Sequence, residues 1–208
     1  MNPFFIYFST ALISYVASIP PGPLSVFVVH TTLQRNLKIA LWVAVGGVFC
    51  ESCYAYLATE SVVIFDAYPR VKFWTQWAII ALLLIVGTVT FFQKTAKIQA
   101  QNVSVNGRLF LFLKGMSLSL FNPALVPFWV VVLLSYQKYD FLKIESLTEK
   151  ISFVLGAGTG TFLLVYTYAF IAHLKKDLVF KYLTDSRLNK IIGSIFILLA
   201  AWQLMSMA

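Results

Sequence analysis

The chain has few charged residues, few cysteines and histidines, and no motif of a nucleotide-using enzyme. Only 12% of its 208 residues are charged, whereas a soluble domain has about 25%. It contains two cysteines and two histidines. No nucleotide-binding fingerprint, Walker motif or hydrolase triad is present, which argues against an ATP-driven mechanism. We therefore expect neither a soluble protein nor an enzyme, and no metal or cofactor.

What the chain has in quantity is apolar sequence, at 60% of all residues. A membrane-spanning helix needs roughly 20 apolar residues, so the length allows about six spans and no separate soluble domain. The N-terminus lacks a basic leader region and is interpreted as a first membrane helix, not a cleaved signal peptide. We expect one all-α membrane domain, 1–208, with hydrophobic segments at 4–34, 38–59, 73–93, 109–137, 151–173 and 190–207.

Lysine and arginine are distributed unequally between the two sets of predicted loops. Eleven of the sixteen flank the odd-numbered loops and five flank the even-numbered loops. Because basic residues concentrate on the cytoplasmic side, both termini are predicted to lie outside. The net charge of +8 is thus interpreted as a topology signal. We expect a lipid bilayer as partner and no nucleic acid, since no soluble basic face is present.

Two predicted segments are interrupted by residues that a membrane helix rarely tolerates. The run 20–23, Pro-Pro-Gly-Pro, breaks the first segment, and Asn122-Pro123 breaks the fourth. Such breaks survive at membrane depth only where they are buried in protein or line a cavity. Each half of the chain therefore has one broken segment followed by two continuous ones. This pattern predicts two inverted three-helix repeats, 1–105 and 106–208.

Both breaks lie near the middle of their segments, which places them at one membrane depth. Paired breaks of this kind mark the substrate site of many secondary transporters. We therefore predict that Pro21, Gly22 and Pro23 line a substrate site together with Asn122 and Pro123.

Each break is predicted to restart a helix whose N-terminus points into the protein. Pro23 suits an early helical position, with Leu24 and Ser25 following, while Asn122 suits an N-cap and Pro123 the first helical position. Free N–H groups and the positive end of the helix dipole favour an anion. We therefore expect these residues to hold a substrate carboxylate.

Glu51 is the only acidic residue that we place deep within a predicted span. An ionisable group at mid-membrane costs about 3 kcal/mol on insertion scales and is a candidate functional residue. Burial disfavours its ionised form, so Glu51 is a candidate proton carrier. Its helix face carries small residues, which predicts that it points into the helix bundle: Ala40, Ala44, Gly47, Glu51, Ala55 and Ala58.

Two further residues near these features are candidates for the same site. Tyr54 follows Glu51 by one helical turn; it is a candidate substrate contact, or the partner of a purely structural Glu51. His30 lies two turns beyond Gly22 and could relay protons to Glu51, since histidine titrates near neutral pH. A packing role for His30 is the alternative.

The remaining local patterns favour structural roles. Cys50 and Cys53 form a C-x-x-C pattern, but in mid-helix cysteines usually act as small apolar side chains. Gly156 and Gly160 form a GxxxG pair, which predicts close helix packing. Direct substrate contact by the neighbouring Thr159 or Thr161 is an open alternative without support from the sequence.

The chain resembles the LysE/RhtB family of bacterial amino-acid exporters. The similar pieces are Pro21-Gly22-Pro23, the stretch from Gly46 to Glu51, and the stretch from Phe112 to Pro123 with its Gly115. Glu51 stands where the family usually carries Asp, and Ala124 stands where Lys is common. The resemblance covers nearly the whole chain. It implies export of amino acids or related small metabolites across the bacterial inner membrane, driven by an ion gradient.

The leading interpretation is a secondary exporter of amino acids or related small metabolites, working by proton antiport. Glu51 would bind the proton and the substrate in turn, with His30 as a second proton-coupling candidate. The alternatives are an ion or metal-cation exporter, or a membrane thiol-redox protein that uses Cys50 and Cys53. The sequence leaves open the substrate and whether the chain forms a homo-oligomer.

Overall fold

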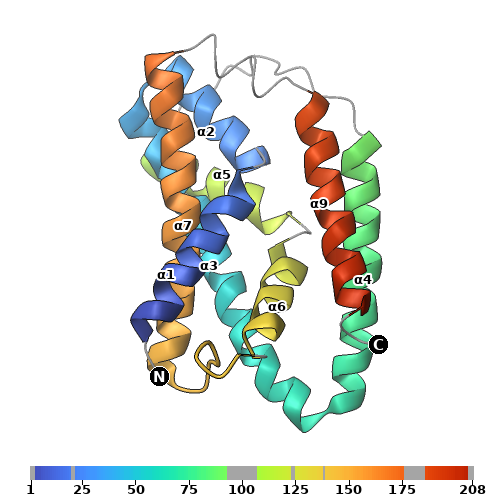
Figure 1. Ribbon diagram of the computed structural model, residues 1–208. Helices are drawn as coiled ribbons and strands as arrows, with labels where there is room; N and C mark the ends of the chain where they lie inside the picture. Colours follow the sequence, from blue (N-terminus) through green and yellow to red (C-terminus); the bar gives the residue numbers. More distant parts are fainter. Residues whose placement is uncertain are drawn as a thin grey trace.

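The computed structural model describes residues 3–19, 22–92, 107–122, 125–137, 139–175 and 186–205. Within these ranges the chain forms helices and no strands, so the all-α prediction is confirmed there (Figure 1). The helices are α1 (Pro3–Ser18), α2 (Pro23–Gln34), α3 (Leu37–Ala67), α4 (Pro69–Phe92), α5 (Arg108–Leu120), α6 (Leu125–Tyr136), α7 (Leu147–Leu174) and α9 (Ser186–Met205).

Three of the described helices are long and apolar enough to cross a membrane. These stretches are Leu37–Ser61 of α3, Phe73–Phe92 of α4 and all of α7. A fourth candidate is the pair α1 and α2 taken as one broken span, with a bend of 75° between the two helices. The predicted membrane character is therefore confirmed, while the number of six spans stays a prediction.

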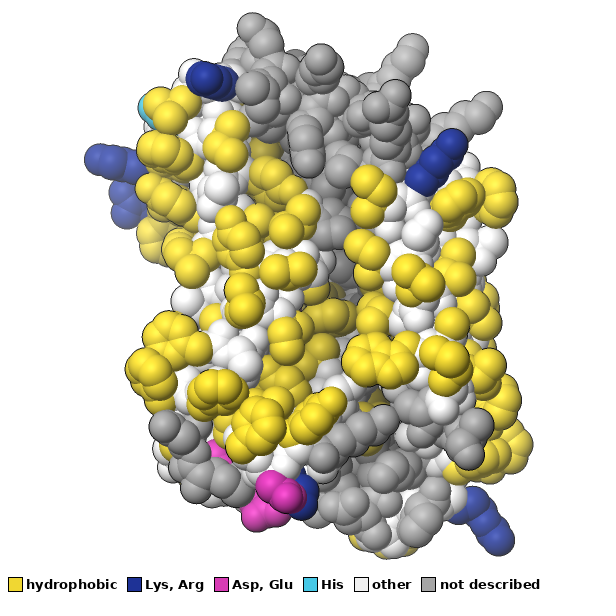
Figure 2. Space-filling model, in the orientation of Figure 1, with side chains coloured by type: hydrophobic (Ala, Val, Ile, Leu, Met, Phe, Trp, Pro, Cys, Tyr) yellow, Lys and Arg dark blue, Asp and Glu magenta, His cyan; other side chains and the backbone are white. Residues whose placement is uncertain are grey.

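The surface of the molecule agrees with this membrane character. Figure 2 shows hydrophobic side chains over the middle of the visible face and charged side chains toward its two ends. Exposed apolar residues of this kind include Leu12, Phe49, Ile85 and Leu198. An apolar belt between charged ends is the surface that a lipid bilayer covers.

Both predicted breaks occur where the sequence placed them. α1 ends at Ser18 and α2 begins at Pro23, while α5 ends at Leu120 and α6 begins at Leu125. Figure 1 shows that α1 and α2 together traverse the molecule in one direction and that α5 and α6 traverse it in the other. Each interruption therefore lies partway through one passage of the chain.

Close contacts at glycines join the helices in pairs. Gly46 of α3 faces the Phe112 carbonyl of α5, and Gly115 of α5 in return faces the Val43 carbonyl of α3. A Cβ atom at either glycine would overlap that carbonyl oxygen, so only glycine permits this crossing.

Two other helix pairs cross in the same way. A Cβ atom added to Gly193 of α9 would lie 2.6 Å from the Gly87 carbonyl oxygen of α4. A Cβ atom added to Gly156 of α7 would lie 2.5 Å from the Tyr7 carbonyl oxygen of α1, and Gly160 faces the Ala11 carbonyl. The close packing predicted from the Gly156–Gly160 pair is confirmed.

Candidate functional site

Glu51 occupies the middle of α3 and points into the protein, as its helix face predicted. The Glu51 side chain is 5% exposed, and the small residues of the same face are buried with it: Ala40, Ala44, Gly47, Ala55 and Ala58. The described ion pairs join Lys143 to Asp140 and Lys150 to Glu60. In that part of the chain Glu51 has no cationic partner, so its carboxyl group is a buried acid among neutral groups.

A cluster of three hydroxyl groups reaches the Glu51 carboxyl through one of its members, and we call Ser14, Ser18 and Thr161 the hydroxyl cluster. Thr161 of α7 is hydrogen-bonded through Oγ1 to Glu51 Oε1 at 2.8 Å. Thr161 Oγ1 also lies 2.8 Å from Ser14 Oγ and 3.2 Å from Ser18 Oγ, both on α1. Ser14 in turn donates to the Ala157 carbonyl at 2.7 Å. The cluster thus ties α1, α3 and α7 together at Glu51.

An indole group from a fourth helix completes the surroundings of Glu51. Trp129 of α6 is fully buried, and its indole N–H lies beside the Glu51 carboxyl. Its Nε1 atom has no hydrogen-bond acceptor within bonding distance among the described residues. A buried donor without an acceptor is uncommon, because leaving it unpaired costs about 1–3 kcal/mol. The Trp129 indole N–H is thus a hydrogen-bond donor that faces the Glu51 carboxyl without a bonded acceptor among the described residues.

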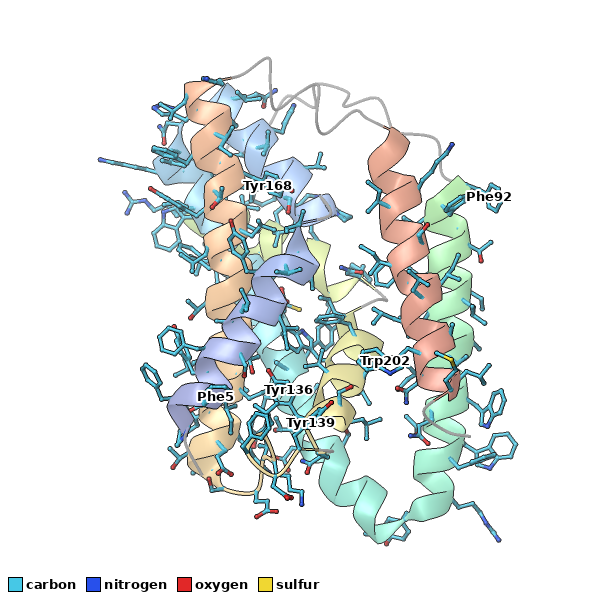
Figure 3. The ribbon with its side chains drawn as sticks, in the orientation of Figure 1. Phe5, Phe92, Tyr136, Tyr139, Tyr168 and Trp202 are labelled. Carbon is cyan, nitrogen blue, oxygen red and sulfur yellow. The ribbon has the colours of Figure 1, made fainter. Side chains whose placement is uncertain are left out.

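The hydroxyl cluster was not predicted as a site, although one signal for it is present in the sequence. Thr10, Ser14 and Ser18 recur every four residues in an otherwise apolar segment, and this spacing puts them on one helix face. Thr10 and Ser14 are buried, and Thr10 Oγ1 lies 3.1 Å from the hydroxyl of Tyr136, which points from α6 toward α1 (Figure 3). The polar stripe of α1 therefore faces the protein interior along its length.

The end of α1 lies at this cluster. Ser18 is the last residue of α1 and reaches Thr161. The Tyr168 hydroxyl of α7 donates to the carbonyl oxygen of Ile19, the next residue along the chain (Figure 3). Two contacts with α7 thus fix the end of α1 just before the interruption.

The end of α5 lies one helical turn farther along α3. The Tyr54 hydroxyl donates to the carbonyl oxygen of Leu120, the last residue of α5, at 2.8 Å. Tyr54 therefore does not pair with Glu51, the alternative that the sequence left open, but satisfies a carbonyl at a helix end. The end of α5 is thus bonded to α3 directly through Tyr54, and the end of α1 is linked to Glu51 through Thr161.

The restarted helix α2 begins as predicted. Gly22 has extended backbone as the N-cap, Pro23 is the first helical residue, and Val26 N donates to the Gly22 carbonyl at 3.1 Å. Ser25 is buried, and the Leu24 side chain packs against Gly47 of α3.

The second restart is described only in part. Leu125 N donates to the Asn122 carbonyl at 3.3 Å where α6 begins. Pro20 and Pro21 at the first break, and Pro123 and Ala124 at the second, lie outside the described residues. The roles predicted for Pro21, Asn122 and Pro123 at the substrate site stay predictions.

The family of the chain is decided by comparison with known families. The model of the LysE type translocator family matches residues 15–207. The chain belongs to the LysE type translocator family. The resemblance found in the sequence is confirmed, and the chain is a membrane transporter of the exporter type. No curated protein and no solved structure matches it in the same comparisons.

The other residues that the sequence singled out in this translocator have no described hydrogen bond with the hydroxyl cluster. His30 is buried on α2 and has no hydrogen bond or ion pair with Glu51 among the described contacts. Cys50 is a buried free thiol and Cys53 an exposed one. Among the described residues no group of three or more His, Cys, Asp or Glu is placed to hold a metal ion. A proton-coupling role for His30 stays a prediction.

Gly22 offers a sharp test of the open space at the first break of the translocator. Its φ of −83° suits any residue, and a Cβ atom there would meet no described atom within 4 Å. We expect Gly22→Val to fold and accumulate in the membrane like the wild type, because nothing clashes. We also expect it to reduce transport about ten-fold or more, because the added side chain fills space next to the substrate path.

Thermal unfolding of purified protein and efflux from proteoliposomes together measure this effect. Gly22→Ala, which adds one methyl group, should give an intermediate loss of transport. Wild-type efflux by Gly22→Val would show that this space lies off the path.

Proposed function

We propose that this translocator exports amino acids or related small metabolites from the cytoplasm in exchange for protons. The observation that carries the proposal is the buried Glu51 carboxyl, which lacks a described cationic partner. Its partner Thr161 contacts the last residue of α1, and Tyr54, one turn farther along α3, bonds to the last residue of α5. Such a carboxyl can hold a proton or pair with a substrate ammonium group, but not both well. Competition for one site makes each ligand displace the other, as exchange requires.

The carboxylate end of an amino acid would be held by the restarted helices. The first N–H groups of a helix have no partner within that helix, and the helix dipole makes this end partly positive. α2 begins at Pro23 and α6 at Leu125, each directly after an interruption. A zwitterionic substrate would therefore place its ammonium group at Glu51 and its carboxylate at one of these N-termini.

The packing of several helix pairs supports the predicted inverted repeat, a plan on which many alternating-access transporters are built. In such a repeat, a residue next to the two-fold axis contacts the equivalent residue of the other half. Glu51 bonds to Thr161, 110 positions later, and a Cβ atom on Gly158 would lie 3.4 Å from Val48, again 110 positions away. Gly87 and Gly193, which are 106 positions apart, face each other at the crossing of α4 and α9.

Two further sets of helix pairs agree with the same axis. α1 packs on α7 as α5 packs on α3, and α2 packs on α7 as α6 packs on α3. In Figure 1, α3 and α7 run in opposite directions, as do α4 and α9. Exchanging the two halves would convert each of these pairs into the other, with its direction reversed, whereas the packing of α2 on α3 has no comparable counterpart between α6 and α7 among the described helices.

We further propose that the protein lies in the bacterial inner membrane with both chain ends outside. The start of α1 and the end of α9 lie toward the lower end of Figure 1. That end carries the described acidic side chains visible in Figure 2, which agrees with the excess of basic residues beside the opposite loops. A C-terminal reporter that is active only in the cytoplasm should stay silent, while one active only outside should give signal. Strong cytoplasmic activity would overturn this orientation.

The proposed function is tested with purified protein in proteoliposomes that contain an equimolar panel of amino acids. Mass spectrometry follows the loss of each amino acid after a pH gradient is imposed. We expect one amino acid or a small group to leave faster with the gradient than without it. A matched set of vesicles loaded with divalent cations tests the alternative substrate class. Gradient-driven cation loss without amino-acid loss would overturn the proposal.

A further inference from the structure

The number of hydrogen-bond contacts around Glu51 can be compared with the number of protons available to fill them. Four close contacts join the group: Glu51 to Thr161 at 2.8 Å, Thr161 to Ser14 at 2.8 Å, Thr161 to Ser18 at 3.2 Å, and Ser14 to the Ala157 carbonyl at 2.7 Å. Each hydrogen bond needs one proton between its two oxygen atoms. The three hydroxyl groups supply one proton each and the carbonyl supplies none. The fourth proton has to come from the Glu51 carboxyl.

With Glu51 protonated, all four contacts become hydrogen bonds that run in one direction. The bond that Thr161 donates to Glu51 in the described geometry would reverse, with the Glu51 O–H donating to Thr161. Thr161 could then donate to Ser14, and Ser14 donates to the Ala157 carbonyl, while Ser18 donates to Thr161. Thr161 then donates once and accepts twice, which is the full capacity of a hydroxyl group. The chain of donors ends at a carbonyl oxygen that needs no proton of its own.

With Glu51 ionised, the same geometry is one proton short. The Thr161 hydroxyl turns to the carboxylate, because a charged acceptor forms the stronger hydrogen bond. The single Ser14 proton then faces two oxygen atoms at 2.7 Å and 2.8 Å. In one of these two contacts no proton lies between the oxygen atoms. Their lone pairs then face each other, which is unfavourable. All four contacts can therefore hold a proton only when Glu51 is protonated.

We propose that the hydroxyl cluster reads the protonation state of Glu51, with Ser14 and Thr161 as the positioning residues that favour its protonated form. The proposal rests on the proposed function only in taking proton release from Glu51 as the coupling step. On release, the proton leaves the protein, Thr161 turns toward the carboxylate and Ser14 loses one of its two partners. The unpaired Trp129 N–H beside the carboxyl is the donor available to the new charge.

No charged side chain is described next to the Glu51 carboxyl. α1 contributes Ser14 and Ser18, α7 contributes Thr161, and α6 contributes Trp129, none of which is charged. On α3 itself the neighbouring titratable groups are Cys50, which is buried, and Tyr54, whose hydroxyl donates to the Leu120 carbonyl. No described cation competes with the hydroxyl cluster for the carboxyl.

The test is an infrared pH titration of purified full-length protein in lipid, which requires no known substrate. A protonated carboxyl has a C=O stretch that disappears on ionisation, and the band belonging to Glu51 is the one that Glu51→Gln removes. Ser14→Ala deletes the acceptor for the Thr161 proton. We expect it to move the midpoint of this band to lower pH by about one unit, the size of one hydrogen bond.

A double-mutant cycle shows whether the effect passes through Thr161. In a Thr161→Val background, Ser14→Ala should cause no further shift, because the link between Ser14 and Glu51 is already absent. Ser14→Cys, with a weaker acceptor in similar volume, should give a smaller shift than Ser14→Ala. Ser117→Ala is the matched control, since that hydroxyl donates to the Lys114 carbonyl of its own helix at 2.8 Å, and it should leave the midpoint unchanged.

Three outcomes would overturn the inference: an unchanged or raised midpoint in Ser14→Ala, an equal shift in the Thr161→Val background, or no Glu51 band at neutral pH. Failure of the proposed function would look different. In that case the titration would behave as expected, while Glu51→Gln would retain gradient-driven efflux.

Discussion

The Glu51→Gln variant is expected to fold, reach the membrane and lose export driven by a proton gradient. The glutamine amide has nearly the shape of the protonated acid, and its carbonyl and NH₂ groups can still bond to Thr161. It can neither release a proton nor pair with a substrate ammonium group through a negative charge. Efflux from proteoliposomes should therefore fall to the level of protein-free vesicles. Both the initial rate and its dependence on pH should be measured.

The same helix offers a matched control for this substitution. Glu60 lies toward the end of α3, where its 41% exposed side chain is paired with Lys150 at 2.8 Å. A surface ion pair contributes little to stability, about 0–1 kcal/mol, so Glu60→Gln should retain export and its pH dependence. Glu51→Asp should retain part of the activity, because the carboxyl group remains on a shorter side chain. Efflux by Glu51→Gln that depends on pH as in the wild type would make Glu51 a structural acid.

The largest effect on stability is expected from Gly46→Val. A Cβ atom at this position would overlap the carbonyl oxygen of Phe112, and backbone atoms cannot turn aside as a side chain can. α3 and α5 would have to separate, which would also pull Gly115 from the Val43 carbonyl that it faces. Overpacking in a core costs about 1–3 kcal/mol, and displaced helices add to this. We expect a loss of at least about 2 kcal/mol.

Thermal unfolding in detergent measures this loss, with Gly22→Val as the control. The chemical change is the same in both variants, but Gly22 meets no described atom within 4 Å of an added Cβ. Gly46→Val should therefore unfold at a clearly lower temperature than the wild type, and Gly22→Val at the same temperature. Equal stability of the two variants would mean that α3 and α5 do not cross at Gly46. Gly115→Val tests the other side of the crossing and should resemble Gly46→Val.

Gly46 and Gly115 show that a family resemblance in sequence does not reveal the structural role of each residue. Gly46 and Gly115 both belong to the sequence pieces that resemble the family, and the structure places them on opposite sides of one helix crossing. Their spacing in the sequence does not indicate this, because a glycine can serve a turn, a packing contact or a substrate path. Gly22, in a third such piece, faces open space instead.

The sequence by itself determined the features that depend on local composition and period. The apolar segments, the two interruptions, the start of α2 at Pro23 and the inward direction of Glu51 all follow from residues within a few turns of one another. Membrane burial makes these signals strong, because an unpaired backbone group or an acid in lipid costs several kcal/mol. The substrate site itself, with the roles of His30 and Asn122, stays a prediction.

Only the tertiary structure decided the partners of Glu51. Its hydrogen-bond partner Thr161 lies 110 positions away, and many hydroxyl groups in this chain bond instead to their own helix, as Thr32 does to the Val28 carbonyl at 2.9 Å. A serine or threonine in an apolar helix has both choices. Which one it makes depends on the neighbouring helix and on how closely glycines such as Gly160 let that helix approach. The packing of α1 and α7, set by atoms distant in the sequence, therefore places the hydroxyl cluster beside the acid.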